Sequence, residues 1–229
     1  MSEARSRILD TIRRGLGRGP LPEAQQATLR ERLTNPPRNL IPARALAAPE
    51  RLLGLFRDMA EEAAAGITPL SRESEIPAAV VSWLEAQGLP ASIVTGEAPL
   101  LSSLAWEAAG IQVQRRAARA GDQAALSVAF AGIAETGTLM LLSGPENPSS
   151  LNFLPDNHLV VLAASTVVGS YEDAWAELRR QHGSLPRTVN LITGPSRSAD
   201  IEQKLQMGAH GPIRLQILLL APSLEAAVR

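Results

Sequence analysis

The chain has 229 residues, 45% of them hydrophobic and 20% charged, and its 22 basic and 23 acidic side chains nearly balance. This composition is typical of one globular domain with a buried core and excludes a disordered or fibrous protein. The lack of cysteine excludes disulfides, thiolate zinc sites and cysteine-ligated iron–sulfur clusters. Because the three histidines also lack a chelating spacing, we expect no intrinsic metal or redox cofactor.

Residues 1–60 form a basic segment that we expect to be a helical extension and arm. They contain 11 arginines and six acidic residues, whereas residues 61–229 have a net negative charge. Ile8, Ile12 and Leu16 recur every four residues and predict a helix that needs a surface to lie on. No aromatic residues lie among the arginines of this helix, so we do not expect nucleic-acid binding and favour a solvated or partner-facing surface.

The pattern of residues 61–229 predicts one α/β domain. We expect helices at 2–16, 22–33, 49–65, 74–87, 97–109, 170–182 and 198–207, and strands at 67–70, 92–95, 111–114, 126–131, 137–142, 159–163, 188–193 and 214–220. Helices that alternate with strands favour a largely parallel sheet flanked by helices. No helix-length segment separates strands 126–131 and 137–142, and a hairpin there would make the sheet mixed.

Membrane insertion is not expected. The most apolar run, Leu215 to Ala221, is far shorter than the ~20 residues that span a bilayer. The N-terminus has no apolar core of the kind that a signal peptide needs. We therefore expect a cytoplasmic protein.

Four short segments place small, polar and ionisable residues beside predicted strands, where ligands of α/β sheets bind. In the first, Glu135 offers a carboxylate, Thr136 and Thr138 offer hydroxyls, and Gly137 allows a positive φ or a close approach of a ligand. The alternative is a glycine-containing hairpin turn with a solvated acid.

Two of the other segments contain a histidine. His158 directly precedes an apolar strand, where an imidazole can act as a general acid or base or simply bond to the backbone. His210 lies between Gly208 and Gly211, so its ring has little steric cover, although a tight connection explains the glycines as well.

The remaining segment runs from Gly194 to Glu202. Ser198 suits a helix N-cap, and Asp200 and Glu202 suit the positive end of the helix dipole. Alternatively, Ser196, Arg197 and Ser198 hold a phosphate or carboxylate together with free helix N–H groups. The segment lacks the lysine and glycine spacing of a Walker loop, so nucleotide binding does not follow.

The order and spacing of these segments resemble a known family. The motifs are Ala134-Glu135-Thr136-Gly137-Thr138, Pro155-x-x-His158, Gly194-Pro195-Ser196-x-Ser198-Ala199-Asp200-Ile201-Glu202 and Gly208-x-His210-Gly211-Pro212. Across residues 65–221 the chain resembles the lactate utilization protein C family, which has a LUD domain. The resemblance implies a fold related to ribose-5-phosphate isomerase and coenzyme A transferases, with the site at strand ends.

The resemblance also implies a function and partners. Family members are linked to oxidation of L-lactate to pyruvate, together with an iron–sulfur protein and an oxidoreductase-like protein. A chain without cysteine fits a non-redox subunit that binds a small organic acid or phosphate-containing ligand, or organises these partners. A purely structural assembly subunit would also explain the asymmetric charge.

A second enzyme class stays open. Many relatives have Asp-Thr-Gly where this chain has Glu135-Thr136-Gly137. Coenzyme A transferases of the related fold use a glutamate before a glycine-containing turn as a nucleophile, so an acyl- or phosphoryl-handling enzyme is the alternative. The glycine-rich coenzyme A signature of those enzymes is not evident.

We expect the candidate residues to form a single anion site. The residues expected to be catalytic are Glu135, His158, Asp200 and His210, and those expected to bind the ligand are Thr136, Gly137, Thr138, Ser196, Arg197, Ser198, Glu202, Gly208 and Gly211. In particular, Glu135, His158, Ser196, Asp200 and His210 should converge on one pocket. The two histidines would add positive charge when protonated.

Overall fold

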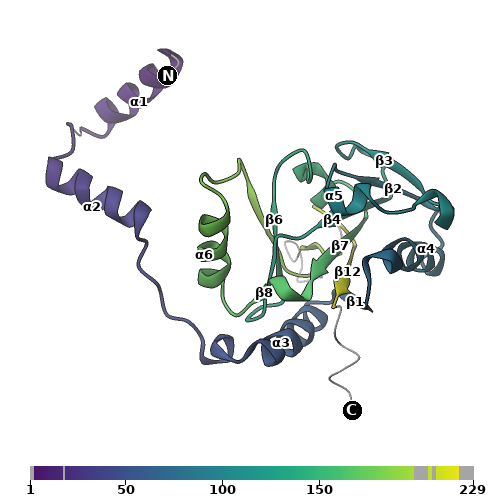
Figure 1. Ribbon diagram of the computed structural model, residues 1–229. Coiled ribbons are helices and arrows are strands. Elements are labelled where there is room, and N and C mark those ends of the chain that lie inside the picture. Colours follow the sequence, from purple (N-terminus) through teal and green to yellow (C-terminus); the bar gives the residue numbers. More distant parts are fainter. Residues whose placement is uncertain (1–2, 18, 199–205, 208–209, 222–229) are drawn as a thin grey trace. The chain divides into compact units, whose positions relative to one another are not determined.

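The computed structural model describes residues 3–17, 19–198, 206–207 and 210–221 (Figure 1). The chain divides into two compact units, residues 1–40 and 41–229. The first unit contains two helices, α1 (Glu3–Gly15) and α2 (Glu23–Thr34), and no side chain described in either helix is buried. The expected boundary after residue 60 differs from this division, because the next helix, α3 (Pro49–Glu62), lies in the second unit.

The second unit is built on a six-stranded parallel sheet, which confirms the predicted α/β class. The strand order is β1-β12-β7-β4-β2-β3. The strands are β1 (Gly66–Leu70), β2 (Ser92–Thr95), β3 (Gln112–Arg115), β4 (Ala124–Val128), β7 (Asn157–Ala163) and β12 (Arg214–Leu220). Every pairing in this sheet is parallel. The central strands β7 and β12 are buried on both sides and mostly apolar, as buried parallel strands are.

A separate four-stranded sheet contains the expected hairpin. Its order is β8-β5-β6-β9, with β5 (Ala131–Ile133), β6 (Thr138–Leu142), β8 (Val167–Val168) and β9 (Val189–Ile192). The predicted strand 126–131 therefore divides between two sheets. The Ala129 N–H donates to Val161 in β7, whereas the next N–H, from Phe130, donates to Met140 in β6. The hairpin thus belongs to a second sheet and not to the edge of a single mixed sheet.

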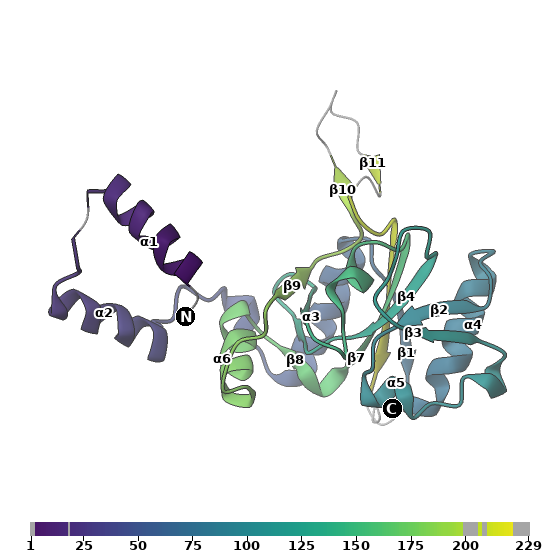
Figure 2. The same ribbon diagram turned by 90° about the horizontal axis from the view of Figure 1, so that it is seen from above.

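Successive side chains of a central strand point to opposite faces of the parallel sheet, and the core that each side chain joins shows which layer covers that face. In β7, Leu159 and Val161 pack in a core with α4 (Ile76–Ala86), while Val160 and Leu162 pack in a core with α3 and the smaller sheet. On the far face of the smaller sheet, Met140 packs against α6 (Tyr171–Gln181). The two sheets are therefore stacked between α4 and α6, as Figures 1 and 2 show.

The predicted helix at 97–109 is much shorter in the structure. It is divided into α5 (Pro99–Ser102) and the 3-10 turn η3 (Glu107–Ala109). Between them, the buried indole N–H of Trp106 donates to the Leu101 carbonyl at 2.7 Å. Anchoring this large side chain in the core replaces the continuation of the helix. The remaining 3-10 turns are η1 (Ala43–Leu46), η2 (Glu73–Glu75), η4 (Ser149–Asn152) and η5 (Ala164–Thr166).

The two described ends of the predicted helix at 198–207 are strands, and residues 199–205 lie outside the described residues. Residues Arg197–Ser198 form β10, which pairs antiparallel with β11 (Gln206–Met207), and Figure 2 shows these two strands beside each other. Just before β10, the Ser196 N–H donates to the Pro212 carbonyl at 2.8 Å. These long-range hydrogen bonds hold the backbone extended at the point where a helix was expected to begin.

Candidate functional site

A small hollow of about 250 Å³ lies at the amino ends of β7 and β12. Its described lining residues are Asn152, Phe153, His158, Leu191, Ile192, Thr193, Gly194, Pro195, Ser196, His210, Gly211, Pro212 and Leu215. His158 and Leu215 are the second residues of their strands and pair with each other in register. The hollow is therefore at the end opposite to the carboxyl ends, where open parallel sheets usually bind ligands.

The hollow brings together four of the residues that were expected to form one site. His158, Ser196, His210 and Gly211 all contribute to its lining although they lie far apart in the sequence. Asp200, Glu202 and Gly208 lie outside the described residues. Among the described lining residues, the two histidines are the only ionisable side chains.

His158 is completely buried and bonds to a serine of the neighbouring strand. Its Nε2 lies 3.1 Å from Ser127 Oγ, and the Ser127 hydroxyl donates to Asn152 Oδ1 at 3.4 Å. Burial lowers the pKa of His158 from 6.5 to about 3. His158 is therefore neutral at physiological pH, and the expectation that it supplies positive charge to an anion is wrong.

Two buried polar atoms of the lining residues have no hydrogen-bond partner within the described part of the chain. They are His158 Nδ1 and Asn152 Nδ2. Burying such an atom without a partner costs about 1–3 kcal/mol. Both residues line the hollow.

The sequence interpretation missed Asn152 and Ser127. Asn152 ends the turn η4 and is 1% exposed, and Ser127 lies in β4 and is also 1% exposed. A serine within the apolar run of β4 was a usable signal, because a buried hydroxyl needs a partner. Asn152 has no comparable signal in its own segment.

The outer part of the hollow is formed by Ser196, Gly211 and the exposed His210. Ser196 is held by its backbone bond to Pro212. A Cβ atom at position 211 would lie 3.2 Å from the Cβ of Ser196 and 3.5 Å from its Oγ. Glycine therefore leaves room for the serine side chain beside the hollow.

Arg197 is not among the described lining residues of the hollow. The Arg197 guanidinium donates to the Ala63 carbonyl at 2.7 Å, and Ser198 belongs to β10. Ser198 lies at the end of a strand, and residues 199–205, which would continue the expected helix, lie outside the described residues. Its role as a helix N-cap and the anion site at that helix start therefore stay predictions.

Glu135 lies outside the hollow and anchors the start of α6. Its carboxylate accepts the Tyr171 N–H at 2.8 Å, and its own N–H donates to the Gly169 carbonyl. The residue is 8% exposed. A carboxylate at the N-terminus of a helix is stabilised by the helix dipole, so this geometry gives Glu135 a structural task.

Gly137 allows the neighbouring turn to pack on α3. Its φ is +64°, and a Cβ atom there would lie 2.3 Å from the backbone nitrogen of Ala60. Both the left-handed backbone and the close approach require glycine. The turn interpretation thus accounts for Gly137 without a ligand.

Hydroxyl groups connect this turn to the hollow. Thr138 Oγ1 lies 2.7 Å from Thr136 Oγ1, 2.9 Å from the Tyr171 hydroxyl and 2.6 Å from Thr193 Oγ1. Thr193 is a lining residue of the hollow. The first segment and the hollow are therefore neighbours joined by a network and not parts of one cavity.

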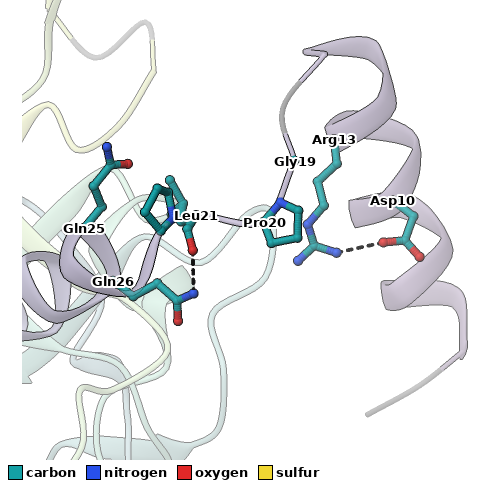
Figure 3. A pocket seen from close by; sticks show the side chains of 8 residues that line it. Asp10, Arg13, Gly19, Pro20, Leu21, Gln25 and Gln26 are labelled. Carbon is teal, nitrogen blue, oxygen red and sulfur yellow. Dashed lines mark hydrogen bonds and ion pairs between the residues drawn. The ribbon is translucent and has the colours of Figure 1, made fainter.

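A larger hollow lies in the N-terminal unit, and side chains that line it are exposed and already paired. Figure 3 shows it between α1 and α2, where Arg13 donates to Asp10 at 2.7 Å and Gln26 donates to the Leu21 carbonyl at 2.8 Å. The side chains of Arg13 and Asp10 are 62% and 60% exposed. Exposed side chains that already pair with each other give no reason to expect a ligand.

Within the described residues, no group of three or more His, Cys, Asp or Glu residues is placed to hold a metal ion. No described helix is both long and apolar enough to cross a bilayer.

Comparison with known proteins identifies relatives by sequence. The family model of the LUD domain matches residues 53–220. An uncharacterised protein of Neisseria meningitidis is 41% identical over 99 residues, which are 43% of this chain and 42% of that protein. Lactate utilization protein C of Geobacillus kaustophilus is 39% identical over 106 residues, 44% of each chain. The protein of the same name from Halalkalibacterium halodurans is 41% identical over 98 residues, 41% of this chain and 43% of that one.

The matched segments span less than half the length of each of these relatives. A solved structure supports the fold: a DUF162 family protein from Deinococcus radiodurans superposes with a TM-score of 0.56 at 22% identity, over 76% of this chain and 99% of that one. Because the LUD domain model matches most of the chain, the chain belongs to the LUD domain family.

Proposed function

We propose that this LUD domain protein is a non-redox component of L-lactate utilization that binds a small organic acid in the hollow at the amino ends of β7 and β12. The relatives named lactate utilization protein C support the process. The observation that supports the binding role is that two lining residues of the hollow, His158 and Asn152, each have a buried polar atom without a partner in the described part of the chain.

The size and polarity of the hollow suit a small acid. Its volume of about 250 Å³ is below the ~300–1,000 Å³ of sites for drug-sized ligands. Apolar side chains such as Phe153 and Leu215 line it beside a few polar groups. A three-carbon acid has the matching combination of one short apolar part and several oxygen atoms.

The chemistry of lactate oxidation requires other subunits in this proposal. Oxidation removes two electrons, and a chain without cysteine has no thiolate to hold an iron–sulfur cluster. We therefore place the electron acceptors in iron–sulfur and oxidoreductase-like partner subunits, which this chain would supply with substrate or hold in position.

The alternative acyl- or phosphoryl-handling enzyme has no comparable support. It requires the Glu135 carboxylate to attack a ligand, whereas this carboxylate already accepts the Tyr171 N–H and lies outside the hollow. No described contact of Glu135 favours a nucleophile over a helix anchor.

Deletion of the gene for this chain in its source organism tests the proposed process. Growth on L-lactate as sole carbon source should be lost and growth on pyruvate should be retained, because only the oxidation step is removed. The wild-type gene should restore growth on lactate. Undiminished growth of the deletion strain on lactate would contradict the proposal.

A site variant connects growth to the hollow. Asn152→Asp replaces the free amide donor with a carboxylate and should not restore growth on lactate. Asn147→Asp is the matched control, because Asn147 is also a buried asparagine, 5% exposed, but is not a lining residue of the hollow. If both variants restored growth on lactate equally, the hollow would not be needed for lactate utilization.

A further inference from the structure

The strand β3 lies at one end of the six-stranded sheet and has a free edge. Among the described residues it pairs only with β2, and Figure 1 shows the two strands side by side. The N–H groups of Gln112 and Arg116 donate to carbonyls on the β2 side at 3.0 and 2.9 Å. Because backbone groups of successive residues point to opposite sides of a strand, the N–H and C=O groups of Val113 and Arg115 point away from β2. These groups are placed to pair with a further strand.

A groove of about 450 Å³, which we call the β3 groove, lies beside this edge. Val113 and Arg115 are two residues apart, so their side chains lie on the same face of the sheet, and both line the groove. Apolar side chains of Leu104 and Ile111 form another part of the lining. A strand paired with β3 would therefore place every second side chain over this groove.

The Arg115 guanidinium is available to a ligand. The residue is exposed, and within the described part of the chain neither a hydrogen bond nor an ion pair engages its side chain. Glu107 also lines the β3 groove but forms no ion pair with it. The next residue, Arg116, differs, because it makes two hydrogen bonds of 2.7 Å to the Asp122 carboxylate. Opposite charges directly across two strands attract, so Arg115 suits a carboxylate on an added strand.

We infer that the edge of β3 docks an extended segment of another protein, antiparallel to β3, with an acidic residue opposite Arg115 and an apolar residue opposite Val113. In this direction each of the two β3 residues exchanges both of its outward backbone hydrogen bonds with the residue opposite. From its amino end, the segment reads acidic residue, any residue, apolar residue. The inference goes beyond the proposed function, because it uses no lining residue of the hollow at β7 and β12.

Charge determines which kind of chain fits this edge. A second copy of this protein would offer its own β3, whose four residues Gln112–Arg115 contain no acid. Two paired β3 strands would therefore leave both arginines without a carboxylate. A basic strand would be repelled, so Arg115 selects an acidic segment of a different protein.

Hydrogen exchange in the full chain tests whether the edge is free. The amides of Val113 and Arg115 should exchange at least about tenfold faster than the amide of Gln114, which faces β2. Equal protection of the three amides would show that the edge is already covered and would overturn the inference. Protection of Val113 and Arg115 that appears only at high protein concentration would assign the edge to a second copy, which also overturns it.

A labelled peptide tests the occupant. The probe is fluorescein-Thr-Glu-Thr-Val-Thr-amide, and its binding to the full chain is measured by fluorescence anisotropy. The same peptide with lysine in place of glutamate should bind about fivefold more weakly, because like charges then face each other. N-methyl groups on the glutamate and valine nitrogens of the probe remove its donors to β3 and should abolish binding. No binding of the probe, or equal binding of the three peptides, would overturn the inference.

Reversing the charge on the protein locates the peptide. Arg115→Glu should bind the lysine peptide in preference to the glutamate peptide. Arg187→Glu is the matched control, because Arg187 is also exposed but is not a described lining residue of the β3 groove, and this variant should keep the preference for glutamate. If Arg115→Glu also kept the preference for glutamate, the peptide would bind elsewhere and the inference would be wrong.

Discussion

His158 Nε2 lies 3.1 Å from Ser127 Oγ, and both side chains are buried in the parallel sheet. The two residues come from adjacent strands, β7 and β4. Since no other partner of Nε2 is present in the described part of the chain, this contact satisfies a buried nitrogen that would otherwise have none.

The Ser127 hydroxyl should contribute measurably to stability. Ser127→Ala leaves His158 Nε2 and Asn152 Oδ1 buried without their partner, so the free energy of unfolding should fall by about 1–3 kcal/mol in urea denaturation. Ser82→Ala changes an exposed serine of α4 and should shift it by less than about 0.5 kcal/mol. Similar values for the two variants would show that the buried hydroxyl contributes nothing.

Stability should depend on pH through His158. Its pKa is lowered to about 3 in the fold, compared with 6.5 for the unperturbed group. Below pH 6.5 the unfolded chain binds a proton that the folded chain does not, so stability falls as the pH decreases toward 3 and is fully present above 6.5. The expected slope is roughly 1.4 kcal/mol per pH unit.

The contribution of His158 is measured by comparing how steeply the free energy of unfolding changes with pH in wild type and in a variant without the imidazole. Urea denaturation from about pH 6 to about pH 4.5 should show wild type losing roughly 2 kcal/mol more than His158→Gln, which has no group to titrate at this position. His158→Asn serves the same purpose if the glutamine variant does not fold. Parallel pH profiles of wild type and variant would contradict the buried neutral imidazole.

Gly137 should be required for packing as well as for its backbone angle. Gly137→Ala places a Cβ atom 2.3 Å from the nitrogen of Ala60 in α3 and should destabilise by more than about 3 kcal/mol. Gly88 has nearly the same φ, +65°, with nothing within 4 Å of its built Cβ, so Gly88→Ala should cost only about 1–2 kcal/mol. Equal costs would mean that α3 moves aside freely.

Glu135 should behave as a helix anchor. Glu135→Gln retains an oxygen acceptor for the Tyr171 N–H and should preserve most of the stability, whereas Glu135→Leu should cost about 1–2 kcal/mol by losing it. Thermal unfolding of the two variants checks this order. Mass spectrometry after incubation with an acyl coenzyme A should show no acyl group on Glu135. A covalent adduct at this residue would instead favour the transferase alternative.

The amino-acid sequence alone was sufficient to predict the elements whose side-chain pattern is local. Residues Arg214–Leu220 were expected as a strand and form β12 with the same bounds, and Ser92–Thr95 likewise form β2. A strand buried on both faces is mostly apolar, so its pattern is visible without knowing its neighbours. The family resemblance also rested on short local motifs, and the LUD domain match confirmed it.

Tertiary structure decided the features that depend on register and on distant partners. The step from one sheet to the other between Ala129 and Phe130 follows from which strand each N–H meets, and the extended segment at Arg197 follows from its pairing with Met207. His158 and Ser127 are 31 residues apart and meet because β7 and β4 pair in one particular register. Asn152 joins them from a turn whose own sequence carries no such signal. A residue's type determines which hydrogen bonds it can make, but only the fold determines which of them are left for a ligand.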